Sequence, residues 1–251
     1  MNTPQQKSFK VLLIGDSCID KYVYGEVRRL NPEAPVPILN YKRTETKQGM
    51  AWNVYNNLKS FGLDVYMLTN EEKIVKTRYI DEKTNQQILR VDEEVHCKPI
   101  NYNISSEGYD AIVISDYNKG FVKSSTIFEL AYGTQCPVFI DSKRVILPSY
   151  GCYVKVNDVE YDKLVEKGDN VIVTRGSKGA EYDGVLYPGE KVNVYDVVGA
   201  GDTFLSALTF GYLKYGKIEE AIPFANKAAA IAVSHPGTYV LSEEDVKNLC
   251  N

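Results

Sequence analysis

The run from Asp196 to Phe204, Asp-Val-Val-Gly-Ala-Gly-Asp-Thr-Phe, has the residue types and spacing best suited to chemistry. It follows a β-rich segment, Glu190–Tyr195, and opens an apolar-periodic one, Thr203–Tyr215. The pattern predicts a strand, a turn of small residues and then a helix N-terminus with an acid in its first turn.

Glycine in such a turn lets the backbone approach a ligand and direct successive N–H groups at it. The helix N-terminus adds about half a positive charge. The run therefore predicts an anion pocket with the Asp202 carboxylate at its edge, an arrangement suited to a hydroxyl that attacks a phosphoryl group. The alternative is an ordinary capped helix start, in which Asp and Thr are common.

Several further segments match one known family in the same order along the chain. The chain resembles the ribokinase/PfkB family of sugar kinases, whose D-x-x-G-A-G-D signature stands here as Asp196–Asp202. The branch that it resembles most is that of the heptose-7-phosphate kinases, including the kinase half of the bifunctional ADP-heptose synthesis proteins. The segments that carry this resemblance are Val11–Gly25, Asn31–Pro37, Lys76–Arg78, Asn85–Gln87, Arg90–Asp92 and Ser115–Gly120.

The resemblance implies that Asp202 is the general base, which takes the proton of a sugar hydroxyl as its oxygen attacks the γ-phosphorus of ATP. Such a transfer depends mainly on positioning and charge neutralisation. The N–H groups of Gly199, Ala200 and Gly201 would stabilise the phosphoryl group in transit.

On the acceptor side, the resemblance implies that Asp20 holds sugar hydroxyls and that Gly49 and Asn53 border the sugar. For Asp20, an exposed charge at the base of the lid is the alternative. The family has a second glycine where this chain has Met50, and Trp52 follows. Either side chain could crowd the pocket or stack on a substrate face, which leaves the sugar open.

Three basic residues, Lys76, Arg78 and Arg90, are candidates for binding a phosphate on the sugar. The planar guanidinium of arginine suits phosphate oxygens. Ordinary surface charge on the lid is the alternative interpretation.

Asn157 and Glu160 match the family's N-x-x-E motif, which holds Mg²⁺ through water and so positions the phosphates of ATP. Magnesium keeps several waters and needs few protein ligands. A helix cap followed by an acid in the first helical turn is the alternative.

The rest of the predicted nucleotide site comes from two later segments. Thr174, Gly176 and Gly179 lie in a turn that touches nucleotide phosphate in the family, and Asn226 matches a helix that borders the adenine. Many members also bind a monovalent cation near the glycine turn. Val198 stands where a threonine is common, so the sequence leaves this ion open.

Composition is consistent with one large α/β domain spanning residues 1–251. Hydrophobic residues make up 44% and charged residues 25% of the 251 residues, as in ordinary globular proteins. A net charge of −4 gives no reason to expect nucleic acid or a membrane surface as partner. Scattered cysteines without a C-x-x-C pair predict reduced thiols and a cytoplasmic protein. The polar segment Met1–Ser8 lacks the apolar core of a signal peptide.

Short apolar strands alternate with helical segments, which predicts a mostly parallel sheet with helices on both faces. In such sheets, ligands bind beyond the carboxyl ends of the strands. Asp16, Asp116, Asp141 and Asn157 all fall at or just after strand ends. The predicted strands are Phe9–Ile14, Val65–Leu68, Ala111–Ser115, Val138–Asp141, Tyr153–Val156 and Asn170–Thr174, and the predicted helices include Gly49–Phe61, Ser124–Tyr132 and Val159–Lys167.

Two segments, 21–42 and 75–92, instead have the pattern of paired strands with polar turns. The resemblance implies that they form a small β-sheet lid, which in the family often also serves as a dimer contact. One departure is clear, because only Asn70-Glu-Glu72 separates Val65–Thr69 from the lid strand Lys73–Tyr79. We therefore expect a three-layer ribokinase-like fold that has lost one peripheral helix–strand unit.

The resemblance thus favours an ATP-dependent kinase that phosphorylates a phosphorylated sugar, above all heptose 7-phosphate at the anomeric position. Two alternatives stay open, a kinase for another simple sugar or nucleoside and a non-catalytic homologue that binds a nucleotide or sugar. Retention of Asp202, Gly199, Gly201, Asn157 and Glu160 together favours an active enzyme.

Overall fold

The structure is a computed structural model that describes residues 8–101 and 104–251. The segment Met1–Ser8, for which the sequence predicts no signal peptide, lies outside this part except for its last residue. None of the described helices is long and apolar enough to cross a lipid bilayer.

An eight-stranded sheet forms the centre of the molecule, in the order β12-β11-β10-β9-β8-β7-β1-β4. All neighbouring strands from β10 to β4 run parallel, whereas β11 and β12 form an antiparallel hairpin at one edge. The strands are β1 (Lys10–Gly15), β4 (Asp64–Thr69), β7 (Ala111–Asp116), β8 (Val138–Ser142), β9 (Tyr153–Asn157), β10 (Val171–Thr174), β11 (Gly179–Tyr182) and β12 (Val185–Pro188).

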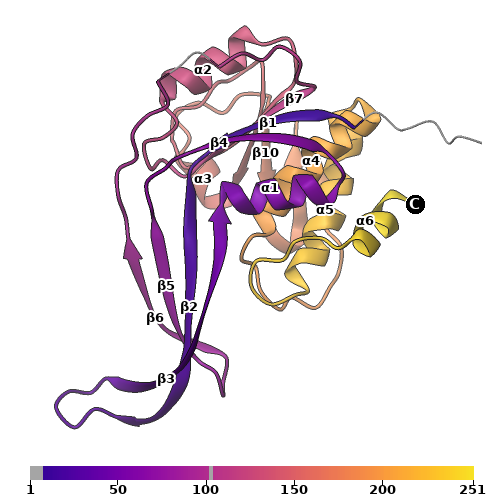
Figure 1. Cartoon of the computed structure of the whole chain (residues 1–251). Helices are drawn as coiled ribbons and strands as arrows, with labels where there is room; N and C mark the ends of the chain where they lie inside the picture. The colour runs from indigo at the N-terminus through magenta and orange to yellow at the C-terminus, as the bar shows by residue number, and fades with distance from the viewer. Residues whose placement is uncertain (1–7, 102–103) are drawn as a thin grey trace, which may run out of the picture.

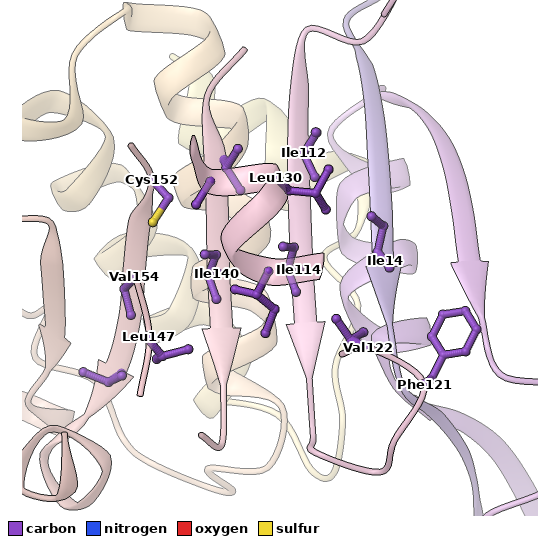
Figure 2. Packing of buried hydrophobic residues seen from close by; sticks show 14 of the residues in the cluster. Ile14, Ile112, Ile114, Phe121, Val122, Leu130, Ile140, Leu147, Cys152 and Val154 are labelled. Atoms are coloured by element: carbon purple, nitrogen blue, oxygen red, sulfur yellow. The ribbon is translucent and has the colours of Figure 1, made fainter. Parts of the chain in front are cut away.

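Helices cover both faces of this sheet, because its central strands are apolar on both faces. Ile112 and Ile114 of β7 pack into the cluster under α2 (Ser124–Gly133) and α3 (Asp158–Lys163), and Figure 2 shows them beside Ile14, Ile140 and Leu130. The alternate residues of β7, such as Val113, pack into a second cluster. That cluster lies against α1 (Ala51–Ser60), α4 (Ala200–Tyr215), α5 (Ile218–Val233) and α6 (Glu243–Cys250).

A second sheet projects from the main one as a long, narrow lid (Figure 1). Its strands are β2 (Ser17–Leu30), β3 (Pro37–Met50), β5 (Val75–Asp81) and β6 (Gln86–Glu93), in the order β3-β2-β5-β6. The chain passes almost directly from β1 into β2 and from β3 into α1. Residues at these junctions therefore lie between the lid and the carboxyl ends of the main strands.

The predicted loss of a peripheral unit is visible at the sheet edge. β4 is the outermost strand, and the chain leaves it at Thr69 and enters lid strand β5 at Val75. Asn70 stabilises this short connection, because its Oδ1 accepts a hydrogen bond from the Ser17 amide at 2.7 Å.

The structure differs from the predicted elements in several places. The first lid segment is longer than the predicted 21–42, since β2 begins at Ser17 and β3 continues to Met50, so that α1 begins two residues later than the predicted helix at Gly49. The segment Glu190–Tyr195 is irregular and not a strand, because no strand in the described part of the chain pairs with it; instead the amides of Tyr195 and Asp196 donate to the Val233 carbonyl. Helix α3 ends at Lys163, four residues earlier than predicted. The sequence also gave no prediction of the β11–β12 hairpin or of α6.

Candidate active site

Asp202 lies in the first turn of α4 with only 7% of its surface exposed. Both carboxylate oxygens accept hydrogen bonds. Asn53 Nδ2 of α1 donates to Oδ2 at 2.9 Å, and the Tyr117 hydroxyl, just after β7, donates to Oδ1 at 3.0 Å. Three separate elements thus fix the orientation of this carboxylate.

Burial raises the pKa of Asp202 to about 6, because the charged form is poorly solvated. The hydrogen bond from Asn53 opposes this shift, the negative charge of Asp141 adds to it, and the Lys155 ammonium and the Tyr117 hydroxyl oppose it. A carboxylate with such a pKa is ionised at neutral pH and is a stronger base than an ordinary aspartate.

The turn before α4 leaves backbone donors free. Gly199 is the N-cap with φ 80°, a left-handed conformation that favours glycine. The Ala200 amide donates within the turn to the Val197 carbonyl at 3.3 Å. In the part of the chain that the structure describes, the amides of Gly199 and Gly201 have no backbone acceptor. Together with the dipole of a 16-residue helix, they make an anion site.

A cavity of about 890 Å³ opens beside this turn. It brings together most of the residues predicted to bind the nucleotide, since its lining includes Asn157, Thr174, Gly176, Gly179 and Asn226 as well as Ala200 and Gly201. The remaining wall is mainly apolar, with Phe204 from α4 and Ala229, Ala230 and Val233 from α5. An apolar wall next to an anion site suits a nucleotide base and its phosphates.

Several of these lining residues also hold the walls in place. The Thr174 hydroxyl donates to the Val156 carbonyl at 3.1 Å, and Asn226 Nδ2 donates to the carbonyls of Tyr187 and Pro188 at 2.9 and 3.2 Å. Gly179 has φ 100°, and a β-carbon there would overlap the backbone of β12. The side chains of Thr174 and Asn226 are therefore used to hold the cavity walls together, and Gly179 lets two backbone segments approach closely.

Asn157 and Glu160 form a capping box at the start of α3. Asn157 Oδ1 accepts from the Glu160 amide, and Glu160 Oε2 accepts from the Asn157 amide, both at 2.9 Å. Glu160 Oε1 is 2.5 Å from Lys143 Nζ. The structure therefore shows the helix cap that was the alternative interpretation of this motif.

The residues near Glu160 fit a magnesium ion that keeps most of its water ligands. They do not fit an ion that is coordinated mainly by protein side chains. Among the described residues, no three His, Cys, Asp or Glu side chains gather in a cluster that could hold a metal. Glu160 would supply one carboxylate, and the phosphates of the nucleotide would supply the other anionic ligands. Mg²⁺ is commonly held in this way, by one or two carboxylates and substrate phosphates.

On the acceptor side, Asp20 of β2 is 6% exposed and pairs with Arg78 of β5, whose Nη1 is 2.5 Å from Asp20 Oδ1. A β-carbon on Gly49 would overlap the Asp20 carboxylate. The space taken by the Asp20 carboxylate therefore favours glycine at position 49, and the expected contact of Gly49 with a sugar stays a prediction. Two predicted substrate residues, Asp20 and Arg78, therefore form one buried ion pair.

The two other basic lid residues lie differently. Lys76 Nζ lies 5.9 Å from the ring centroid of Tyr117, so it reaches the base of the site. Arg90 is directly opposite Arg78 in the lid register but pairs with the exposed Asp92 on its own strand. The structure thus brings Lys76 and Arg78 to the site and leaves Arg90 on the outer lid strand.

Met50 and Trp52 were expected either to crowd the sugar pocket or to stack on a substrate face. Met50 is instead packed in the core cluster with Ile14 and Cys18, and the Trp52 ring contacts Tyr55 edge-on at 5.1 Å between centroids. Met50 has φ 57° and ψ −127°, which explains why the family has glycine at this position.

Sequence reasoning missed two residues that the structure places at Asp202. Tyr117 belongs to the Ser115–Gly120 motif but had no predicted role, and Lys155 had none either, although a lysine in the middle of a buried strand is an unusual pattern. Lys155 Nζ is 2.6 Å from Asp141 Oδ2. Burial alone would raise the pKa of Asp141, but the Lys155 and Lys143 ammonium groups hold it below its usual value.

Comparison with known proteins identifies relatives along the whole chain. The family model described as pfkB family carbohydrate kinase matches residues 157–245. The bifunctional protein HldE of Helicobacter acinonychis is 32% identical over 311 aligned positions, which cover 96% of this chain and 66% of the relative. HldE of Salmonella newport is 30% identical over 308 positions, which cover 99% of this chain and 65% of the relative. The chain spans just under two thirds of the length of these curated relatives.

Solved structures agree on the fold. The ribokinase of Thermotoga maritima matches with a TM-score of 0.68 at 17% identity, covering 96% of this chain and 99% of that one. The Arabidopsis thaliana ribokinase complexed with ribose and ATP matches with a TM-score of 0.70 at 16% identity, covering 97% and 99%. At these identities the likeness shows the fold alone. Together, the family model, the curated relatives and the glycine turn with Asp202 show that this chain belongs to the PfkB family of carbohydrate kinases.

Proposed function

We propose that the protein transfers the γ-phosphoryl group of ATP to the anomeric hydroxyl of a phosphorylated sugar, most closely a heptose 7-phosphate. The observation that carries the proposal is the buried Asp202 carboxylate at a helix N-terminus with free amides, beside a nucleotide-sized cavity. The similarity to bifunctional HldE proteins and the resemblance to the heptose-7-phosphate branch support the choice of acceptor.

In the proposed reaction, the acceptor hydroxyl lies against Asp202. As the new oxygen–phosphorus bond forms and the bond to ADP breaks, the hydroxyl proton passes to the Asp202 carboxylate. Asn53 and Tyr117 hold that carboxylate in place, and the Gly199 and Gly201 amides stabilise the charge on the moving phosphoryl oxygens. A magnesium ion near Glu160 would supply further charge neutralisation on the nucleotide phosphates.

The lid supports an acceptor that carries its own phosphate. Arg78 is buried against Asp20, and Lys76 extends over Tyr117. Asp20 can accept from sugar hydroxyls while Arg78, held at its side, donates to a phosphate. Charge-assisted hydrogen bonds of this kind are each worth about 1.5–3 kcal/mol, so a sugar without its phosphate should be a much poorer substrate.

An ADP-release assay over a substrate panel tests this proposal. The panel contains heptose 7-phosphate, unphosphorylated heptose, ribose, fructose and a nucleoside, each measured with wild type and with Arg78→Ala. We expect kcat/KM to be higher for the sugar phosphate by roughly one to several powers of ten, at about 1.4 kcal/mol per tenfold. Arg78→Ala should remove most of that preference and change the free sugar little.

Two results would change the proposal. A free sugar or nucleoside that is turned over as well as any sugar phosphate would favour the alternative of a simple sugar or nucleoside kinase. Nucleotide binding without turnover of any acceptor would favour a non-catalytic homologue. Asp202→Asn serves as the negative control, since it keeps the shape of the side chain but cannot accept the proton, a loss that typically costs ~10²–10⁴-fold in rate.

A further inference from the structure

We propose that Lys155 is a further catalytic residue, whose ammonium group binds the phosphoryl group in transit beside the Gly201 amide. The inference rests on the proposed phosphoryl transfer from ATP and adds a cation to it that neither the family signature nor the sequence motifs pointed to.

The position of Lys155 follows from the pleat of β9. Its neighbours Val154 and Val156 are fully buried in the cluster on the α2 side of the sheet. Because successive side chains of a strand point to opposite faces, Lys155 points to the face that α4 covers. There it lines the nucleotide cavity together with Gly201, and its side chain is only 5% exposed.

Gly201 shows how close the lysine comes to the turn. A β-carbon built on Gly201 would lie 2.7 Å from Lys155 Nζ. Gly201 is not among the glycines with positive φ, so its backbone conformation does not require glycine. The short distance instead shows that the Lys155 ammonium group lies against the backbone of the turn.

Asp141 holds the ammonium group in this place. The two residues are directly opposite each other in the register of β8 and β9, and Oδ2 lies 2.6 Å from Nζ. An ammonium has three N–H donors, and in the described part of the chain Asp141 is the one hydrogen-bonding partner recorded for Nζ. Burying unsatisfied donors is costly, whereas an anion in the adjoining cavity would satisfy them.

A fixed cation here would act where charge develops. As the bond to ADP breaks and the bond to the acceptor oxygen forms, negative charge is spread over the three equatorial oxygens of the phosphoryl group. The Gly199 and Gly201 amides and the Lys155 ammonium would bind those oxygens, while the acceptor proton passes to Asp202. Lys155 therefore contacts the γ-phosphoryl group, which ATP has and ADP lacks.

Because ATP and ADP differ in the γ-phosphoryl group, the role of Lys155 can be tested by nucleotide binding alone, without an acceptor sugar. Isothermal titration calorimetry with magnesium measures the Kd of ADP and of the non-hydrolysable ATP analogue AMP-PNP on wild type and Lys155→Met. We expect the variant to bind the analogue roughly ten- to a hundredfold more weakly, as for a lost charge-assisted hydrogen bond, and to bind ADP within about threefold of wild type. Lys163→Met, an exposed lysine on α3, is the matched control and should change neither Kd.

Lys155→Met leaves Asp141 buried without its partner, so Lys155→Met/Asp141→Asn is measured alongside it. The double variant removes both charges and should show the same selective loss for the analogue. Equal weakening of ADP and analogue, or no change in either, in a variant that folds would overturn the role of Lys155 and leave the kinase proposal standing. Failure of the wild type to bind either nucleotide would overturn both.

Discussion

In the proposed reaction Asp202 takes the proton of the acceptor hydroxyl, and the pKa of its carboxyl group makes this role testable. Because burial raises that pKa to about 6, the base is protonated below this pH, and kcat/KM should fall as the pH is lowered through that range. A sugar phosphate also titrates near pH 6, so the wild-type profile alone cannot assign the group.

The variant Tyr117→Phe tests whether the fall of kcat/KM at low pH reports the protonation of Asp202. The Tyr117 hydroxyl donates to Asp202 Oδ1 and so stabilises the charged form. Without it the pKa of Asp202 rises, and the acid limb of kcat/KM should move to higher pH on the same substrate, whose own titration is unchanged. An acid limb at the wild-type position would mean that this limb does not report Asp202.

Met50 shows how a residue can be buried and strained together. Its φ of 57° and ψ of −127° match the first central position of a type II′ turn, which favours glycine. Ala is normally the more stable residue by about 0.5–1 kcal/mol, but strain in such a region costs of order 1–3 kcal/mol. We therefore expect Met50→Gly to be more stable than Met50→Ala by about 1 kcal/mol in chemical denaturation, since both remove the same buried side chain. Met50→Ala being the more stable variant would contradict this interpretation.

At the scale of elements, the junction of β9 and α3 carries the proposed magnesium role. The Glu160 carboxylate is engaged by the helix cap and by Lys143. Glu160→Gln keeps an oxygen for the cap but loses the charge, so α3 should remain folded while the site holds Mg²⁺ more weakly. We expect the Mg²⁺ concentration for half-maximal rate to rise several-fold, measured by titration at saturating ATP. Asp162→Asn on the same helix is the control, and an equal change in both variants would leave Glu160 with only its capping role.

The elements also show how far the sequence could predict the structure. The central strands were predictable because burial on both faces makes them continuous apolar runs, as in β1 and β7. The segment 190–199 has similar β-branched residues, but strand formation depends on a partner strand that the local sequence cannot supply. The ion pair of Lys155 with Asp141 joins residues directly opposite in the register of β8 and β9, and that of Arg78 with Asp20 joins residues two positions apart across β2 and β5. Both pairs depend on which strands lie side by side, which is a tertiary property. A dimer contact through the lid remains a prediction.

At the scale of the molecule, the site is divided between two parts of the chain. Among the described residues, those that line the proposed nucleotide cavity lie between Lys155 and Val233, a span that nearly coincides with the residues 157–245 that the family model matches. The residues proposed to bind the acceptor come from β2, α1 and β5, and they are Asp20, Asn53 and Arg78. The alignment to HldE spans 311 positions whereas this chain has 251 residues, so the relative contains segments that are missing here. The edge strand β4 lies next to the position of the missing helix–strand unit, and none of its residues lines the proposed nucleotide cavity.

This division predicts that binding of the sugar phosphate and binding of the nucleotide can be weakened separately by mutation. Asp20→Asn removes a charge on the acceptor side only, so kcat/KM for the sugar phosphate should fall by roughly one to two powers of ten. The Kd of ADP, measured calorimetrically without acceptor, should stay within about threefold of wild type, because distant sites without shared partners act independently. Ala229→Phe is the reciprocal variant, since Ala229 lines the nucleotide cavity, and it should weaken ADP binding while the sugar phosphate still binds. A tenfold loss of ADP affinity in Asp20→Asn would show that the two sides form one coupled unit, with the lid transmitting changes at Asp20 to the nucleotide.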